Sequence, residues 1–129
     1  MTEPLKDKTV LVVADDANIR DLLLRVLEEA GANVVTADSV ESAFETYRQS
    51  PPHAVVADIR LGTSDGYALI KAIRETDVEY RGSTVVVAVT ESASAEEQQR
   101  AFAAGFDAYI TKPFDPDEIV ERLRERLSN

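Results

Sequence analysis

Five polar residues lie where short apolar runs of this sequence end, and together they could carry phosphoryl chemistry. Asp15 and Asp16 follow one run, Asp58 ends another, and Thr90 and Lys112 follow two more. Crowded carboxylates repel one another unless a cation lies among them, and hard oxygen ligands with open water positions suit magnesium better than zinc. A lysine and a hydroxyl opposite them could hold phosphoryl oxygens. The set therefore indicates a site that moves a phosphoryl group onto or off an aspartate.

Each of these residues also has a plainer structural explanation. Acidic pairs cap helices, threonine is common in strands, and Lys-Pro is a dipeptide that stops helices. Asp58 could likewise cap the next helix, although Asp65, directly before Gly66, suits that role better. The combination is more specific than its members, because each residue type must stand at the end of its own strand.

The chain between these positions alternates between strand and helix patterns. Apolar runs predict strands at residues 9–14, 33–37, 84–89 and 108–111, and a further strand that ends at Asp58. Helical spacing of apolar residues predicts helices from about residue 19 to Gly31, then over 38–48, from 66, over 94–105 and from 115. Five such units with short connections imply an α/β fold, with a parallel sheet covered by helices on both faces. Ligands of such sheets bind beyond the carboxyl ends of the strands, where the five polar residues lie.

Three helix starts carry recognisable capping residues. Asp38 with Glu41 three residues later gives an acidic start signal for the second helix, and Ser94 with Glu97 forms a capping box for the fourth. Asp115, directly before Pro116, is the expected N-cap of the last helix.

The composition is that of one small domain. With 129 residues, 44% of them hydrophobic, the chain has a real core but no length for a second domain. We expect residues 1–8 to be a flexible lead-in and residues 9–129 to form the domain. A run of about 18 apolar residues is missing, as is a basic start followed by an apolar stretch. We therefore expect no membrane span, no secretion signal and a cytoplasmic protein.

Composition also excludes several classes of site. The chain has no cysteine and one histidine, which rules out disulfides, thiolate metal sites and histidine-based zinc sites. His53 alone could be the base of a catalytic triad, but a polar residue at the start of a strand is the simpler interpretation. The formal net charge of -10 repels nucleic acid and anionic lipid, so we expect no direct binding of either.

From residue 9 to residue 127 the sequence resembles the receiver domains of two-component response regulators. The matching residues are the pair Asp15 and Asp16, Asp58 with Asp65 and Gly66, Thr90, Ala104 with Gly105, Tyr109, and Lys112 with Pro113. The resemblance implies a flavodoxin-like (βα)5 fold with a five-stranded parallel sheet in the order 2-1-3-4-5. It also implies that Asp58 accepts a phosphoryl group from a phosphohistidine on a histidine kinase or a histidine phosphotransfer protein.

The resemblance further implies a metal site and a switch. Mg²⁺ would be held by Asp15, Asp16, Asp58 and the backbone carbonyl of Arg60, with waters and phosphoryl oxygens as the remaining ligands.

In the switch, Lys112 would pair with the phosphoryl group, the Thr90 hydroxyl would move toward it, and Tyr109 would turn from an exposed to a buried rotamer. The surface that responds would be the fourth helix, fifth strand and fifth helix, read by a downstream effector. The Lys112–Pro113 bond is expected to be cis, as is typical of the family.

Three positions depart from the family pattern. Gly62 stands where proline is usual, Leu61 replaces a common methionine, and Glu91 replaces a small residue after the threonine. Glycine adds backbone freedom to the loop after Asp58. We hypothesise that Arg60 pairs with Glu91 as a lid over the phosphorylation site; alternatively, both side chains are solvated.

Alternatives to a phosphorylated receiver remain open at this point. An aspartyl-phosphate phosphatase or phosphotransferase would carry a second acid at position 60, where Arg60 stands, so we expect no enzyme acting on external substrates. A receiver-like module that is never phosphorylated would normally have lost one of the key residues. A flavin-binding domain would need a hydroxyl- and glycine-rich loop after the first strand, whereas this chain has two aspartates there, which would repel a phosphate.

The responding surface could also form a homodimer; the alternative is that its charged side chains are simply solvated. Tyr109, with Arg100 on the fourth helix and Arg122 or Arg126 on the fifth, could form the dimer through salt bridges to acidic neighbours.

Overall fold

The computed structural model describes residues 3–58, 66–80, 84–91 and 94–127, with the side chains of 78–80 left aside. Five strands alternate with five helices in this part of the chain. The elements are β1 (Thr9–Val13), α1 (Ala17–Glu29), β2 (Asn33–Ala37), α2 (Val40–Gln49), β3 (Ala54–Asp58), α3 (Gly66–Tyr80), β4 (Val85–Thr90), α4 (Ala95–Ala104), β5 (Ala108–Thr111) and α5 (Pro116–Leu127). The strands form one parallel sheet in the order β2-β1-β3-β4-β5, as predicted.

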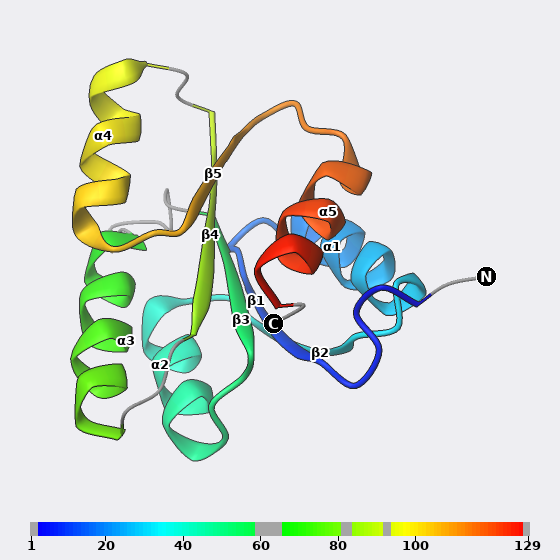
Figure 1. The fold of residues 1–129 in the computed structure, drawn as a ribbon, viewed down its shortest axis with the longest axis horizontal. Coiled ribbons are helices and arrows are strands. Elements are labelled where there is room, and N and C mark those ends of the chain that lie inside the picture. Colours follow the sequence, from blue (N-terminus) through cyan, green and yellow to red (C-terminus); the bar gives the residue numbers. More distant parts are fainter. Residues whose placement is uncertain (1–2, 59–65, 81–83, 92–93, 128–129) are drawn as a thin grey trace.

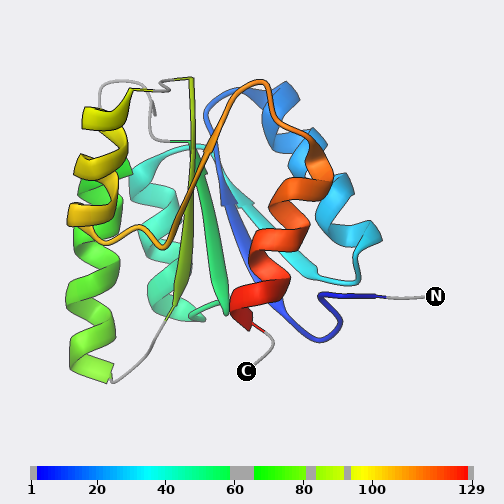
Figure 2. The ribbon, with the colours of Figure 1, turned by 45° about the horizontal axis from the view of Figure 1, so that its top comes forward.

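The helices cover both faces of the sheet, with α1 and α5 on one face and α2, α3 and α4 on the other (Figures 1 and 2). The side chains of β1 explain why its sequence is apolar throughout. Val10 and Val12 pack in the cluster that includes α1 and α5, whereas Leu11 and Val13 pack in the cluster that includes α2 and α3. A strand covered on both faces has no solvent side and therefore shows no polar alternation.

The strand register brings the polar ends of β3, β4 and β5 to the same edge. Asp58 pairs with Val89 and Thr90 pairs with Thr111, so the ends of three neighbouring strands lie level. Asp15 follows β1, the neighbour of β3 on its other side. The fold therefore gathers residues about a hundred positions apart, as the alternation of elements predicts.

The caps of α4 and α5 agree with the sequence patterns, that of α2 does not, and Asp65, the predicted cap of α3, lies outside the described residues. The N-cap of α2 is Ser39, whose hydroxyl accepts from the Ser42 backbone N–H at 3.1 Å, so the prediction of Asp38 as the start is wrong by one residue. Ser39 has the extended backbone that places a short hydroxyl beside that N–H, whereas Asp38 accepts from the Ser42 hydroxyl at 3.5 Å. At α4, Ser94 accepts from the Glu97 N–H at 3.1 Å, which confirms that cap.

The segment before β1 contributes to the core. Leu5 is fully buried, and its N–H donates to the Ala30 carbonyl at 2.9 Å. Gly31 allows this approach, because it has a φ of 99° and a Cβ there would lie 2.7 Å from the Cβ of Glu3. The domain boundary at residue 9 stays a prediction, but the packed structure begins at least four residues earlier, at Leu5.

Among the described residues, no helix combines the length and the apolar character that a membrane span requires.

Candidate functional site

Asp58 and Lys112 form an ion pair at the carboxyl edge of the sheet. The Lys112 Nζ donates to the Asp58 Oδ2 at 2.7 Å, and the side chains are 5% and 14% exposed for Asp58 and Lys112 respectively. Asp58 is the last residue of β3 and Lys112 directly follows β5, so the lysine spans the end of β4, which lies between them. A carboxylate this buried needs a cationic partner, and Lys112 supplies it.

Thr90 lies between these two residues as the last residue of β4. It is 2% exposed, and its carbonyl accepts from the Lys112 N–H at 2.7 Å. The chain therefore positions Lys112 through a backbone hydrogen bond to the residue that was predicted to contact the phosphoryl group. The Lys112–Pro113 peptide bond that follows is cis, as expected.

Asp15 and Asp16 are exposed at the end of β1. The Asp16 Oδ1 accepts from the N–H groups of Asn18 at 2.8 Å and Ile19 at 3.3 Å, which makes Asp16 the N-cap of α1. Asp16 therefore caps a helix in this structure, which is the plainer explanation that the sequence offered for the acidic pair. Capping through Oδ1 leaves the second carboxylate oxygen of Asp16 without a role in the cap.

Arg20 is a residue near this edge that the sequence patterns did not single out. Its guanidinium donates to the Ala14 carbonyl at 2.8 Å, directly before the acidic pair. The signal in the sequence is a cation one helical turn after Asp16. Arg20 fixes the backbone at the end of β1, from which Asp15 and Asp16 extend.

The acidic side chains at this edge match the chemistry of a Mg²⁺ site but do not complete one. Within the described ranges, no three acidic or histidine side chains come close enough together to hold a metal. The carboxylates of Asp15, Asp16 and Asp58 are hard oxygen donors on neighbouring strands, which is the ligand type that Mg²⁺ prefers. Such an ion would need further oxygens from water, phosphate or backbone. The predicted backbone ligand, Arg60, lies outside the described residues.

Of the other sequence-predicted residues, Glu91 and Tyr109 lie in the described part of the chain. Glu91 is exposed directly after β4. Arg60, its predicted lid partner, falls outside the part of the chain that the structure describes, as do Leu61, Gly62 and Asp65. Tyr109 is half-buried in β5, and its ring centroid lies 6.4 Å from that of the exposed Phe102 on α4. Tyr109 thus links β5 to α4, within the surface expected to respond.

A polar cluster, buried at Tyr47, Asp77 and Thr84 and half-buried elsewhere, lies away from the strand ends that carry Asp58. We define it by Tyr47, Arg74, Asp77, Thr84 and Asp107. Arg74 donates to the Gly105 carbonyl twice, at 3.0 and 2.7 Å, and to the Thr84 carbonyl, Asp77 and Asp107 at 2.7 to 2.9 Å. The Tyr47 hydroxyl donates to Asp77 at 2.5 Å. Burial and this hydrogen bond raise the pKa of Tyr47 to about 12.

Sequence reasoning missed this cluster because its partners come from α2, α3, the start of β4 and the loop before β5. Arg74 and Asp77 are three residues apart on α3, and an acid–base pair at that spacing was the available signal. The cluster joins α3 to the α4–β5 connection.

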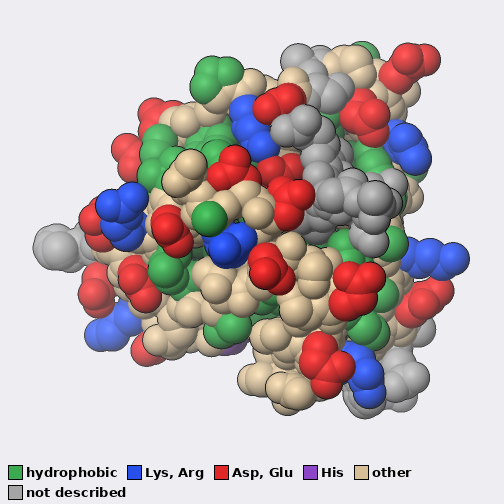
Figure 3. Space-filling view, turned by 180° about the vertical axis from the view of Figure 1, so that it is seen from behind, with side chains coloured by type: hydrophobic (Ala, Val, Ile, Leu, Met, Phe, Trp, Pro, Cys, Tyr) green, Lys and Arg blue, Asp and Glu red, His purple; other side chains and the backbone are tan. Residues whose placement is uncertain are grey.

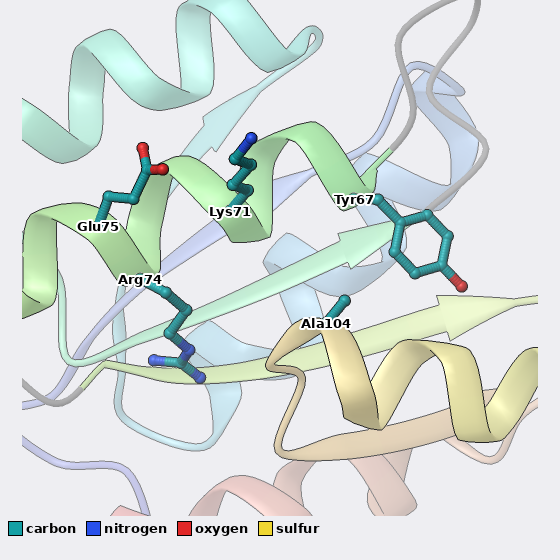
Figure 4. Close-up of a pocket in the computed structure, with 5 residues that line it drawn as sticks. All are labelled: Tyr67, Lys71, Arg74, Glu75 and Ala104. Carbon is teal, nitrogen blue, oxygen red and sulfur yellow. The ribbon is translucent and has the colours of Figure 1, made fainter.

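A cavity of about 460 Å³ lies between α3 and α4 (Figure 4). Its lining residues are Tyr67, Lys71, Arg74, Glu75 and Ala104. It includes none of the residues predicted for the phosphoryl site, so the candidate site is the strand edge and not this cavity.

The charged side chains on the surface reflect the net charge of -10. In the view of Figure 3, acidic side chains are spread over the molecule with basic ones among them, and no continuous basic patch is visible on the coloured surface. Electrostatic attraction toward nucleic acid has no support on this face.

Comparison with protein families shows the family of this chain. A model described as the response regulator receiver domain matches residues 10–124. The chain belongs to this family. Its fold, with the order 2-1-3-4-5, is that of the receiver domains, which are signalling modules.

Curated relatives of this receiver domain include short and long proteins. An uncharacterized 14.6 kDa protein of Leptolyngbya boryana is 35% identical over 124 residues, with 95% of this chain and 92% of that protein covered. The phosphate regulon transcriptional regulatory protein PhoB of Escherichia coli is 32% identical over 117 residues, covering 91% of this chain. The match spans 50% of PhoB, so the receiver corresponds to about half of that regulator.

Solved structures agree with the family. A putative response regulator from Chloroflexus aurantiacus has a TM-score of 0.87 and 31% identity, covering 96% of this chain and all of that one. The BeF3-activated receiver domain of DrrB, from Thermotoga maritima, has a TM-score of 0.83 and 31% identity, covering 95% and 98%.

Proposed function

We propose that Asp58 is the phosphoacceptor of this receiver domain. The observation that carries the proposal is the 2.7 Å contact between Lys112 Nζ and Asp58 Oδ2 at the carboxyl edge of a receiver fold. The donor is a phosphohistidine on a histidine kinase or a histidine phosphotransfer protein. A carboxylate oxygen of Asp58 forms the new P–O bond, the P–N bond breaks, and the histidine leaves with the electron pair of that bond and takes up a proton.

The neighbouring side chains stabilise the product. Lys112 moves from the carboxylate to an oxygen of the phosphoryl group, because that group carries more negative charge than the carboxylate it replaces. The Thr90 hydroxyl, two strands from β1 and buried at the end of β4, turns toward the same group. Both residues are already held at this edge, so little reorganisation is needed.

Asp15, Asp16, Asp58 and the backbone carbonyl of Arg60 would hold Mg²⁺. When bound, the ion neutralises the acidic edge and the oxygens of the transferring group. Asp16 can serve both as the N-cap of α1 and as a metal ligand, since its Oδ1 accepts the capping hydrogen bonds and its other carboxylate oxygen is not used in the cap.

The output is a change in the surface formed by α4, β5 and α5, in which Tyr109 moves from an exposed to a buried rotamer. A downstream effector reads that surface in the cytoplasm, and the domain modifies itself without acting on external substrates. A homodimer through this surface would have to compete with contacts inside the chain. Arg100 lies 3.7 Å from Glu97, and Arg122 lies 3.8 Å from both Glu118 and Glu125.

The test is intact-mass spectrometry after incubation with Mg²⁺ and a phosphorylated histidine kinase. Wild type should gain one phosphoryl group and Asp58→Asn none. The matched control is Asp38→Asn, because Asp38 directly follows β2 at the same edge and is exposed. This control should gain the group as wild type does. Equal gain in wild type and Asp58→Asn would overturn the proposal.

A further inference from the structure

Helix α4 has a weak apolar attachment to the rest of the domain. Ala101 is its buried residue, whereas its large apolar side chain, Phe102, is 45% exposed. Helix α5 by contrast buries Ile119 and Leu123. An alanine removes far less apolar surface from water than an isoleucine or leucine. Packing alone therefore holds α4 less firmly than α5.

The cavity between α3 and α4 adds little apolar contact to this attachment. Figure 4 shows Tyr67 and Arg74 at opposite ends of it, with Ala104 of α4 between them and Lys71 and Glu75 pointing away from α4. This space of about 460 Å³ is open, and of its lining residues one, Ala104, belongs to α4, so little apolar contact joins the two helices there. Polar contacts at the two ends of α4 must then fix its position.

The first of these contacts, which we call the α4 latch, consists of Tyr67, Glu97 and Arg100. The Tyr67 hydroxyl donates to a Glu97 carboxylate oxygen at 2.5 Å. Arg100 lies 4.5 Å from the centroid of the Tyr67 ring and 3.7 Å from Glu97. Burial, followed by the bond to Glu97, raises the pKa of Tyr67, so its hydroxyl remains a donor. The latch combines a charge-assisted hydrogen bond with a cation–π contact.

The second contact, the Arg74 anchor, lies at the other end of α4. Arg74 donates twice to the carbonyl of Gly105, the C-cap of the helix. Gly105 has a φ of 120°, and a Cβ there would lie 3.1 Å from the Arg74 Cγ. Because Arg74 is itself fixed by Asp77 and Asp107, this end of α4 is firmly tied to α3 and β4.

The latch lies at the end of α4 that follows the phosphorylation site in the chain. Glu97 is in the first turn of α4, whose N-cap Ser94 comes four residues after Thr90. Tyr67 is in the first turn of α3, at the same edge of the sheet as Asp58. A movement of Thr90 toward a phosphoryl group would act first on the latched end, because fewer residues separate Thr90 from Glu97 than from Gly105.

We propose that Tyr67 is a positioning residue of the switch: it holds the N-terminal end of α4 in the unphosphorylated state, and phosphorylation releases that end while α4 turns about the Arg74 anchor. This inference rests on the proposed function of Asp58. The latch costs free energy to open, so it favours the unphosphorylated state, and its removal shifts the equilibrium toward the active one.

Hydrogen exchange of the α4 amides tests whether the latch exists. In the unphosphorylated protein, Tyr67→Phe should speed exchange over residues 95–101 on the order of tenfold, the effect of losing a hydrogen bond to a charged group. The matched control is Tyr47→Phe, which removes an equally short hydrogen bond to the Asp77 Oδ1 and leaves in place the Asp77 Oδ2 that holds Arg74. It should leave exchange in α4 as in wild type. Unchanged exchange in Tyr67→Phe, or an equal rise in both variants, would overturn the latch.

The phosphorylated proteins test whether phosphorylation releases the α4 latch. Phosphorylated wild type should exchange in α4 as fast as unphosphorylated Tyr67→Phe, and the phosphorylated variant should show no further rise. Tyr67→Phe should also take up the phosphoryl group several-fold faster than wild type and Tyr47→Phe. An α4 that stays protected in phosphorylated wild type would overturn the release. Failure of Asp58 to gain the group, seen by mass, would contradict the proposed function and leave the first test intact.

Discussion

Lys112 Nζ and Asp58 Oδ2 lie 2.7 Å apart, although 54 residues separate them in the sequence. The pair is formed where β3 and β5 end on either side of β4. It gives a buried carboxylate a cationic partner, and it keeps the lysine beside the atom proposed to react. If Asp58 is the phosphoacceptor, as we propose, Lys112 is in place before any donor arrives.

This pair gives a prediction about stability. Lys112→Met should lower the free energy of unfolding by about 1–3 kcal/mol, because it leaves the buried Asp58 carboxylate without its cation. Adding Asp58→Asn to that variant should recover part of the loss, since the unpaired charge is then gone. Urea unfolding of the four proteins gives the coupling energy. Strictly additive effects would show that the two side chains do not stabilise each other.

Arg74 gives a second prediction. Arg74→Gln should lower the free energy of unfolding by about 2–4 kcal/mol, because it removes ionic hydrogen bonds to Asp77, Asp107 and the Gly105 carbonyl. Urea denaturation measures the change. Arg48→Gln is the matched control, as Arg48 is an exposed arginine that lies over the Phe44 ring at 6.0 Å. A loss in Arg74→Gln no larger than in this control would contradict the account of the polar cluster.

Tyr47 gives a prediction about alkaline pH. Its folded-state pKa is raised from 10.0 to about 12, so the folded protein holds this proton more tightly than the unfolded chain does. The corresponding stability is fully present below pH 10 and is lost as the pH rises to about 12. The loss amounts to about 2–3 kcal/mol. Between pH 9 and about 12, the free energy of unfolding should decline less in Tyr47→Phe than in wild type. Parallel declines would contradict the prediction.

Glu91 tests the lid hypothesis. If Arg60 and Glu91 form a lid, Glu91→Ala should open the site, with several-fold faster phosphorylation by small phosphodonors and a changed lifetime of the acyl phosphate. Time-resolved intact-mass spectrometry measures both rates. Glu96→Ala is the control, because Glu96 is an exposed glutamate in the first turn of α4. Rates of Glu91→Ala that equal those of wild type would rule out the lid.

The sequence was sufficient to predict the sheet and to predict that Asp58, Thr90 and Lys112 lie at one edge of it, whereas their roles stay predictions. Runs such as residues 9–14 are too short for a helix and apolar on both faces, so they define buried parallel strands. Once five such units alternate with helices, topology places Asp58, Thr90 and Lys112 at one edge. The distance between Asp58 and Lys112 was beyond sequence reasoning, because it depends on the register of three strands.

Other features depend on contacts between distant segments. The preference for Ser39 over Asp38 as a cap depends on the backbone angle of a single residue. The burial of Leu5 depends on the approach allowed by Gly31. Arg74 reads as an ordinary helix arginine until the loop before β5 is placed beside it.

The most direct test of the central claim is to trap the acyl phosphate chemically and locate it. Borohydride reduces an aspartyl phosphate to homoserine, which peptide mass spectrometry assigns to a position. After phosphorylation in the presence of Mg²⁺, homoserine should be found at position 58 and not at Asp15, Asp16 or Asp38. A phosphorylated protein in which position 58 remains aspartate after reduction would contradict the account.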